Sequence, residues 1–389
     1  MLQYYSADWI FPVNSAPIQN GVVEVYQSGT ISRILDKGHA DLIHVKDIIK
    51  FEGALVPGFI NTHCHLELSH MLGAVPEKTG IVDFVQNIIK NRDLDGEAIL
   101  SAMDDADQQM FHNGIVAVGD ISNQILSKPI KEKSRIFYHT FVEAMGFNPA
   151  RAASIMQHAM QVKEGFAPLK ASVVPHAPYS VSPELFKLIH DQAISDDNFI
   201  SIHNQESPAE ESFFIDKTGD FLKLYTFLGL DISFFEATGK TSVQSYLPYL
   251  KQLKILLVHN TFTNTDDINF VKQQDVEVYW CLCPGANLYI EDALPNVDLL
   301  INKGLKITLG TDSLASNHQL NILKEMQILQ QHKQVPFNRL LQWATLNGAE
   351  FLGLSEHLGS IEPGKTPGLN LIQLSEDFII KNDLVQKII

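Results

Sequence analysis

Apolar and polar positions alternate in two different ways along the chain. Residues 1 to 55 contain short β-forming runs, such as 22–26 and 31–35, which glycine, aspartate and lysine interrupt without a helical period. From residue 56 onward, short apolar runs alternate with longer stretches whose apolar positions recur at helical spacing, for example 81–91 and 320–332. The first pattern predicts a small β unit, and the second predicts repeated strand-then-helix units.

Eight apolar runs in the second part are candidates for parallel strands. They are residues 55–65, 115–120, 136–143, 171–176, 199–203, 254–259, 276–281 and 305–312. Strands that helices cover on both faces read as nearly continuous apolar runs, and eight such strands are the number that a (β/α)8 barrel needs. A late run at 369–374 is a strand that could rejoin the N-terminal β unit. We therefore predict an α/β fold built around a barrel.

Composition and charge narrow the classes of function. The chain has 389 residues, of which 45% are hydrophobic and 19% charged, as is typical of a globular protein. Its net charge of −16, without a run of Lys or Arg, argues against nucleic acid and against an anionic membrane as partners. We see no secretion signal, no apolar run long enough to span a bilayer, and no disulfide framework among three cysteines. We expect a cytoplasmic protein that binds a small molecule.

Histidines and one aspartate stand at the C-terminal ends of the predicted strands. The strand ends carry His63, His65, His176, His203, His259 and Asp312. His63 and His65 would share a face of the first strand, because side chains alternate along a strand. The C-terminal ends of barrel strands meet at one mouth, where barrel enzymes hold their active sites. Each of these residues alone could simply cap a strand, but the whole set predicts a common site.

Imidazole nitrogens and a carboxylate are suitable ligands for a divalent metal ion. The candidates for these ligands are His63, His65, His203 and Asp312. Water bound to such a metal loses a proton near neutral pH and becomes a nucleophile. Glu206, three residues after His203, could carry that proton to a ring nitrogen of the substrate, unless it is a solvated loop residue. Asp312 can also act as a base, and His259 can hydrogen-bond the hydroxide.

Several short motifs have the sequences of one known family. They are Pro57-Gly58-Phe59-Ile60-Asn61-Thr62-His63-Cys64-His65, His176-Ala177-Pro178-Tyr179-Ser180, His203-x-x-Glu206, Cys283-Pro284-x-x-Asn287, Gly310-Thr311-Asp312-Ser313 and Gly359-Ser360-Ile361-Glu362-Pro363-Gly364-Lys365. In this order, they resemble the amidohydrolase superfamily, in the mononuclear deaminase and chlorohydrolase branch that includes guanine, cytosine and methylthioadenosine/adenosylhomocysteine deaminases. The resemblance implies a distorted (β/α)8 TIM barrel over residues 56–352. It also implies a small composite β-sandwich domain from both termini, residues 1–55 and 353–389.

The resemblance also implies roles for the candidate residues. The ligands named above would hold one divalent ion, with zinc favoured over iron. Glu206 would be the proton shuttle, His259 a catalytic histidine and His176 a substrate contact. Binuclear members carry a carboxylated lysine at the end of the fourth strand, where this chain has Pro175 and His176. A single metal is therefore expected, and the family precedent is a homodimer.

The substrate is suggested by a narrower resemblance. The segments 65–69 and 80–84 resemble a subgroup that deaminates aminodeoxyfutalosine, an adenine nucleoside that carries a carboxyphenyl ketone. Glu67 could accept hydrogen bonds from the ribose or base, and Arg92 could clamp a carboxylate or simply be a solvated cation at a helix end. We expect metal-bound hydroxide to attack the amino-bearing carbon of an adenine-type base, with release of ammonia.

The sequence leaves two other classes of function as alternatives, and it leaves the roles of several residues undecided. A hydrolase of the same fold could displace chloride, an alkylamine or a cyclic amide, and a non-enzymatic metal-stabilised protein would need neither Glu206 nor Asp312 as a proton carrier. Asp120 and Glu143 could line the pocket or accept backbone N–H bonds. Cys281 and Cys283 lack the second cysteine pair of a structural zinc site, so we expect them in the core.

Overall fold

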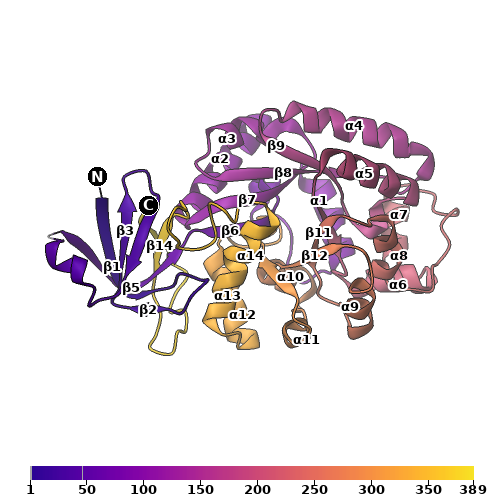
Figure 1. The fold of residues 1–389 in the computed structure, drawn as a ribbon. Coiled ribbons are helices and arrows are strands. Elements are labelled where there is room, and N and C mark those ends of the chain that lie inside the picture. Colours follow the sequence, from indigo (N-terminus) through magenta and orange to yellow (C-terminus); the bar gives the residue numbers. More distant parts are fainter. Residues whose placement is uncertain (1, 46) are drawn as a thin grey trace.

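The computed structural model describes residues 2–45 and 47–389, and a seven-stranded mixed sheet joins both ends of this chain (Figure 1). Its strands are β1 (Leu2–Ile10), β2 (Ile18–Gln19), β3 (Val22–Tyr26), β4 (Ile31–Leu35), β5 (Ile48–Pro57), β14 (Leu369–Ile372) and β15 (Gln386–Lys387). The strand order is β15-β14-β5-β1-β3-β4, and β2 pairs with β1. Leu371 of β14 lies opposite Leu55 of β5. Strands from both ends of the chain thus belong to one hydrogen-bonded sheet, and the division into a composite β-sandwich domain and a barrel domain stays a prediction.

The remaining strands form two parallel sheets of four strands each. The first sheet contains β6 (Phe59–Cys64), β7 (Ile115–Ser122), β8 (Phe137–Ala144) and β9 (Lys170–Pro175). The second contains β10 (Ile200–Asn204), β11 (Lys254–His259), β12 (Glu277–Leu282) and β13 (Lys306–Leu309). In both sheets the strands lie in chain order, so helices must connect consecutive strands. These are the eight strands that the apolar runs predict.

The two parallel sheets approach each other at both of their edges, as the parts of a distorted barrel do. Cys64 forms a parallel bridge with Asp312. The N–H groups of Thr311 and Asp312 both donate to the His63 carbonyl at 3.1 Å. At the other junction, the N–H of His203 donates to the carbonyl of His176 at 3.0 Å. The C-terminal ends of β6, β9, β10 and β13 therefore meet.

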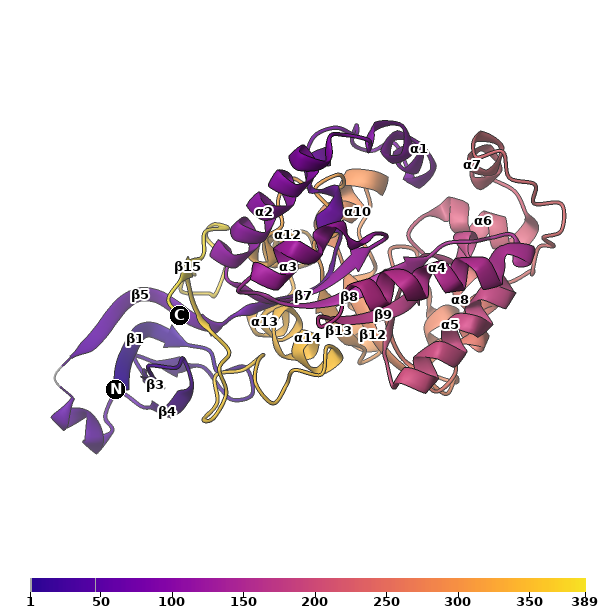
Figure 2. The ribbon, with the colours of Figure 1, turned by 90° about the horizontal axis from the view of Figure 1, so that it is seen from above.

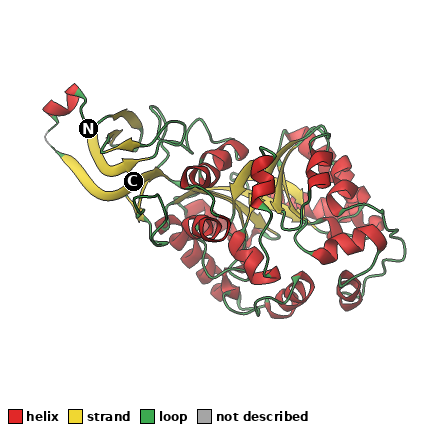
Figure 3. Cartoon of the chain, turned by 90° about the horizontal axis from the view of Figure 1, so that it is seen from below, coloured by secondary structure: helices red, strands yellow, loops and turns green. Residues whose placement is uncertain are grey.

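Helices surround the strands of this larger part (Figures 2 and 3). They are α1 (Ile81–Asn91), α2 (Gly96–His112), α3 (Lys128–Lys133), α4 (Ala152–Gly165), α5 (Pro183–Asp196), α6 (Pro208–Asp216), α7 (Phe221–Phe227), α8 (Ser242–Tyr246), α9 (Thr265–Val271), α10 (Pro284–Glu291), α11 (Val297–Asn302), α12 (Ile322–Lys333), α13 (Phe337–Ala344) and α14 (Leu346–Phe351). The helical pattern predicted at 81–91 is confirmed by α1. The pattern at 320–332 corresponds to α12, which begins after Asn321 because that side chain accepts from the N–H of Leu323 and Lys324.

Buried apolar side chains form a main core and a second cluster at the barrel mouth. The main core includes Phe141, Leu257 and Ile307 from the parallel strands. The second cluster joins α1, α6, α7 and α10 and includes Ala177 after β9 and Ala315 after β13, so it lies at the C-terminal side of the strands. No helix in the described residues is long and apolar enough to cross a membrane.

Gly310 permits the close approach of β13 to β6. A Cβ atom at this position would lie 2.9 Å from the His63 Cβ, the His63 carbonyl oxygen and the Cys281 Sγ. We predict that Gly310→Ala separates the two sheets at the cost of about 1–3 kcal/mol and lowers the thermal unfolding midpoint. Gly96→Ala is the control, because a Cβ atom there meets nothing within 4 Å. Equal midpoints for Gly310→Ala and the wild type would show that this contact does not constrain the fold.

Candidate metal centre

The four predicted ligands converge where the two parallel sheets meet. His63 belongs to β6 and His65 directly follows it, whereas His203 belongs to β10 and Asp312 lies just after β13. The Nε2 atom of His65 lies 3.1 Å from His63 Nε2 and 3.3 Å from His203 Nε2. The Asp312 Oδ1 atom lies 3.3 Å from His65 Nε2 and 3.8 Å from His63 Nε2. All four side chains are buried, so the structure brings the predicted ligand set together.

This donor set fits a divalent cation. Ligand atoms about 2.0–2.1 Å from a tetrahedral zinc ion lie about 3.3–3.4 Å from one another, close to the separations seen here. Burial lowers the pKa of His65 to about 3, and burial together with His65 lowers the pKa of His203 to about 4. Both rings are therefore neutral at neutral pH, as metal ligands must be. A metal ion bound between these ring nitrogens would accept the lone pair of each.

Outer hydrogen bonds orient two of these ligands. The Nδ1 atom of His203 faces the carbonyl of His176 at 2.7 Å and the Oε1 atom of Glu143 at 3.5 Å. The hydroxyl of Ser316 donates to Asp312 Oδ2 at 2.8 Å. These contacts leave His203 Nε2 and Asp312 Oδ1 directed at the cluster, as the outer partners of metal ligands usually do.

Glu206 and His259 form a buried pair beside the cluster. Glu206 Oε1 lies 3.5 Å from His259 Nε2. Burial, followed by the charge of Asp312, raises the pKa of Glu206 well above its ordinary value, and burial lowers the pKa of His259. The Asn287 amide Nδ2 lies 3.2 Å from His259 Nδ1 and can donate to it. This bond would place the ring proton of neutral His259 on Nε2, toward Glu206.

Four residues at these strand ends have a left-handed backbone. The φ angles are 47° for Gln205, 74° for His259, 57° for Asn260 and 59° for Asp312. Such angles are uncommon for residues other than glycine, and they tend to cluster at functional sites where the surrounding structure holds them. The strain follows from turning the chain sharply after β10, β11 and β13 while the side chains stay directed at the mouth.

Comparison with known proteins places this arrangement in a family. The model of the amidohydrolase family matches residues 54–387. The chain belongs to the amidohydrolase family. This confirms the resemblance found in the sequence motifs.

Relatives of this amidohydrolase include named deaminases. The chain is 25% identical over 350 residues to an adenosine deaminase of Helicobacter pylori, covering 88% of this chain and 84% of the relative. It is 28% identical over 356 residues to an aminodeoxyfutalosine deaminase of Nitratiruptor, covering 86% and 82%. The crystal structure of Helicobacter pylori aminofutalosine deaminase in complex with methylthio-coformycin superposes with a TM-score of 0.80 at 25% identity, covering 97% of this chain and 93% of that one.

Two of the three predicted substrate contacts lie beside the ligand cluster of the amidohydrolase. Glu67, in the 3₁₀ helix η2 (Leu66–Met71), accepts from the Asn123 N–H at 3.0 Å and from Asn123 Nδ2 at 2.9 Å. The same amide lies 3.5 Å from Glu143 Oε2. The ring centroid of His176 lies 4.9 Å from that of His203.

Arg92, the third predicted substrate contact, does not lie with Glu67 and His176 beside the ligand cluster. It follows α1, its side chain is exposed, and its carbonyl faces His70 Nε2 at 3.0 Å. No ion pair in the described part of the chain includes its guanidinium. This position agrees with a solvated cation at a helix end, which was the alternative interpretation.

Other acidic residues and the cysteines have structural contacts around the centre. Asp120 forms a fully buried ion pair with Lys131 at 2.6 Å, and its Oδ1 accepts from the N–H of Leu66 at 2.8 Å. It therefore accepts a backbone N–H bond beside His65, which is one of the two roles that the sequence left open for Asp120. Cys281 and Cys283 are buried with their Sγ atoms 3.9 Å apart, and their predicted place in the core is confirmed.

Sequence reasoning missed Glu210, which holds the loop of the proposed proton shuttle. Its fully buried carboxylate accepts from the N–H of Gln205 at 3.0 Å and of Glu206 at 3.2 Å. Its own N–H donates to Ser207 Oγ, which caps α6. The pattern Ser207-x-x-Glu210 is a known signature of a helix start, so the sequence did contain a signal that pointed to Glu210.

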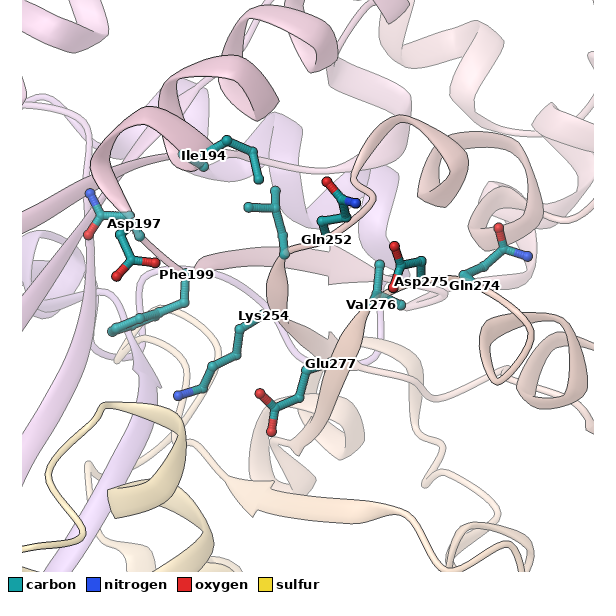
Figure 4. Close-up of a pocket in the computed structure, with 12 residues that line it drawn as sticks. Ile194, Asp197, Phe199, Gln252, Lys254, Gln274, Asp275, Val276 and Glu277 are labelled. Carbon is teal, nitrogen blue, oxygen red and sulfur yellow. The ribbon is translucent and has the colours of Figure 1, made fainter.

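A hollow lies at the other side of the barrel (Figure 4). Its volume is about 640 Å³, and its lining includes Phe199, Lys254 and Glu277 at the N-terminal ends of β10, β11 and β12. None of the predicted site residues lines it. Active sites of barrel enzymes lie at the C-terminal ends of the strands, so the geometry of the donors, and not the size of a hollow, locates the site.

Removal of the Ser316 hydroxyl tests the role of the outer hydrogen bonds. Ser316→Ala leaves Asp312 Oδ2 without its 2.8 Å donor. We predict that zinc affinity falls about 10- to 100-fold, as is common when an outer partner of a metal ligand is lost. A chelator competition titration measures this. Ser313→Ala is the control, because its hydroxyl contacts Ser316 and not the Asp312 carboxylate; equal affinities for both variants would contradict the assignment.

Proposed function

We propose that this amidohydrolase is a metal-dependent deaminase that hydrolyses the amino group of an adenine-type nucleobase or nucleoside and releases ammonia. The main support is the buried Glu206–His259 pair beside the four converging candidate ligands. The names of both sequence relatives, and of the solved neighbour with bound methylthio-coformycin, are those of deaminases. Zinc is the proposed ion, because histidine nitrogens and aspartate oxygens are among the ligands that zinc binds.

The proposed ligands are His63, His65, His203 and Asp312. A divalent cation in this set would supply Lewis-acid activation of water. The residues of the chain then handle protons and orientation. Burial raises the pKa of Glu206 well above its ordinary value, which favours the protonated form, and Glu206 would donate this proton to the ring nitrogen next to the amino-bearing carbon.

Asp312 and His259 complete the proposed proton path. Burial raises the pKa of Asp312, while His203 and the Ser316 hydroxyl oppose this rise. Asp312 can therefore accept a proton as the water attacks and pass it to the leaving amine. His259, with its Nδ1 facing Asn287, directs its Nε2–H into the site and fixes the attacking oxygen by a hydrogen bond.

Glu67 and His176 are the proposed substrate contacts. Each oxygen of Glu67 is already directed by Asn123, and a carboxylate can accept further bonds from ribose hydroxyls. His176 can contact the base, because its ring lies beside that of His203. The name of the Nitratiruptor relative makes aminodeoxyfutalosine one substrate to test. The carboxylate clamp at Arg92, the cytoplasmic location and the homodimer stay predictions from the sequence.

Glu206→Gln tests the proton shuttle. We predict that kcat falls about 10²- to 10⁴-fold, because glutamine cannot transfer a proton, whereas the metal content per chain stays the same. Ammonia release from adenosine, methylthioadenosine, aminodeoxyfutalosine and free adenine measures the activity. Glu236→Gln is the control, since Glu236 is an exposed loop residue.

Measuring the released group distinguishes deamination from displacement of chloride or an alkylamine. Absence of ammonia from every amine tested with zinc-loaded wild type would contradict the proposed deamination. Release of chloride or alkylamine from matched heterocycles would then support the second type of hydrolase. Near-normal turnover by Glu206→Gln would leave deamination possible but remove Glu206 from the mechanism.

A further inference from the structure

Glu325 is a fully buried carboxyl group that the proposed reaction does not use. It lies in α12 with 0% of its surface exposed, and no ion pair among residues 2–45 and 47–389 includes it. Burial raises the pKa of Glu325 to about 7, and its hydrogen bonds to Gly285 and Asn317 oppose this rise. Burial of a carboxyl group is costly unless hydrogen bonds satisfy it. Its two oxygens accept hydrogen bonds from two different segments, the start of α10 and the loop after β13.

The first hydrogen bond fixes the start of α10. Glu325 Oε2 accepts from the N–H of Gly285 at 2.7 Å. Gly285 is the second residue of α10, and Asn287 lies in the same first turn of that helix. Asn287 Nδ2 donates to Thr261 Oγ1 at 2.7 Å and lies 3.2 Å from His259 Nδ1. Glu325 therefore fixes the helix that orients His259.

The second hydrogen bond fixes the loop after β13. Glu325 Oε1 accepts from Asn317 Nδ2 at 2.8 Å. The same amide donates to the carbonyl of Thr311 at 2.9 Å. Thr311 precedes Asp312 in the chain, and Ser316, which precedes Asn317, donates to the Asp312 carboxylate. Glu325 therefore also fixes the loop that carries Asp312.

Gly285 shows how closely the start of α10 approaches the loop that carries Asp312. A Cβ atom at this position would lie 2.6 Å from Asn317 Nδ2 and 2.7 Å from Glu325 Oε1. No side chain larger than hydrogen fits there unless the contact opens. Gly285 and Asn317 both present N–H groups to the Glu325 carboxyl group, so Glu325 must accept two hydrogen bonds.

We propose that Glu325 is a positioning residue that links the start of α10, whose Asn287 contacts His259, to the loop that carries Asp312, and so sets the spacing of these two proton-handling groups. The proposal rests on the proposed function, because it assigns both groups to the deamination site. Glu325 itself touches neither group. A displacement of about 1 Å in a catalytic group can lower a rate about 100-fold, so a link of this kind affects kcat more than binding.

Glu325→Gln tests this role with the smallest change of shape. The glutamine amide turns one acceptor into a donor, which faces either the Gly285 N–H or the Asn317 amide. We expect kcat to fall about 10- to 100-fold, with KM within about twofold and the same zinc content per chain. The control is Glu356→Gln in an exposed turn, which should have wild-type kcat. A kcat within twofold of wild type, or a loss that matches a loss of zinc, would overturn the proposal.

Gly285→Ala tests the same link from the opposite side. Its Cβ would open the contact between Asn317 and Glu325 without changing either side chain. The variant should also lose kcat while KM and zinc content are retained, and it provides the test if Glu325→Gln does not fold. A wild-type kcat in Gly285→Ala would overturn the proposal.

A spectroscopic measurement separates this inference from the proposed function. In cobalt-substituted protein, the visible absorption bands report the arrangement of Asp312 around the metal and require no substrate. If wild type deaminates none of the amines tested, the proposed function fails, and the cobalt spectrum then decides the positioning role. Shifted bands in Glu325→Gln, with unchanged bands in Glu356→Gln, would support the link, and unchanged bands in both would overturn it.

Discussion

The contact between β13 and β6 is the interaction on which the candidate metal centre depends. The His63 carbonyl accepts the N–H groups of Thr311 and Asp312, and Cys64 forms a bridge with Asp312. These bonds join the first strand of one parallel sheet to the last strand of the other. They place the Asp312 carboxylate 3.3 Å from His65 Nε2, although the two residues are far apart in the sequence. Candidate ligands from the first and the last strand of the barrel can therefore share one ion.

Burial gives this centre its electrostatic character. It lowers the pKa values of His63, His65 and His203, and it raises those of Asp312 and Glu206. Without a metal ion, the site therefore favours neutral imidazoles and protonated carboxyl groups. A bound dication needs neutral imidazoles, which burial already favours, and its charge opposes the effect of burial on a carboxyl ligand by stabilising the carboxylate form. The apolar cluster at the mouth keeps the local dielectric constant low and strengthens these effects.

Much of the fold and of the ligand set can be predicted from the sequence, because strand ends are local signals. The apolar runs before His63, His203 and His259 show where parallel strands end, and such ends meet at one rim. Hydrogen-bond partners are harder to predict, since they come from distant segments. Glu210 and Glu325 look like ordinary helix residues until the loops that they bind are placed around them. The same limit applies to Arg92, whose charge suggests a clamp while its position leaves it exposed.

The number and place of metal ions test the account most directly. Anomalous diffraction at the zinc edge, from crystals of the zinc-loaded protein, measures both without reference to activity. The account predicts one peak, bound by the Nε2 atoms of His63, His65 and His203 and by an oxygen of Asp312. No peak among these atoms, or two peaks bridged by a modified lysine, would contradict it.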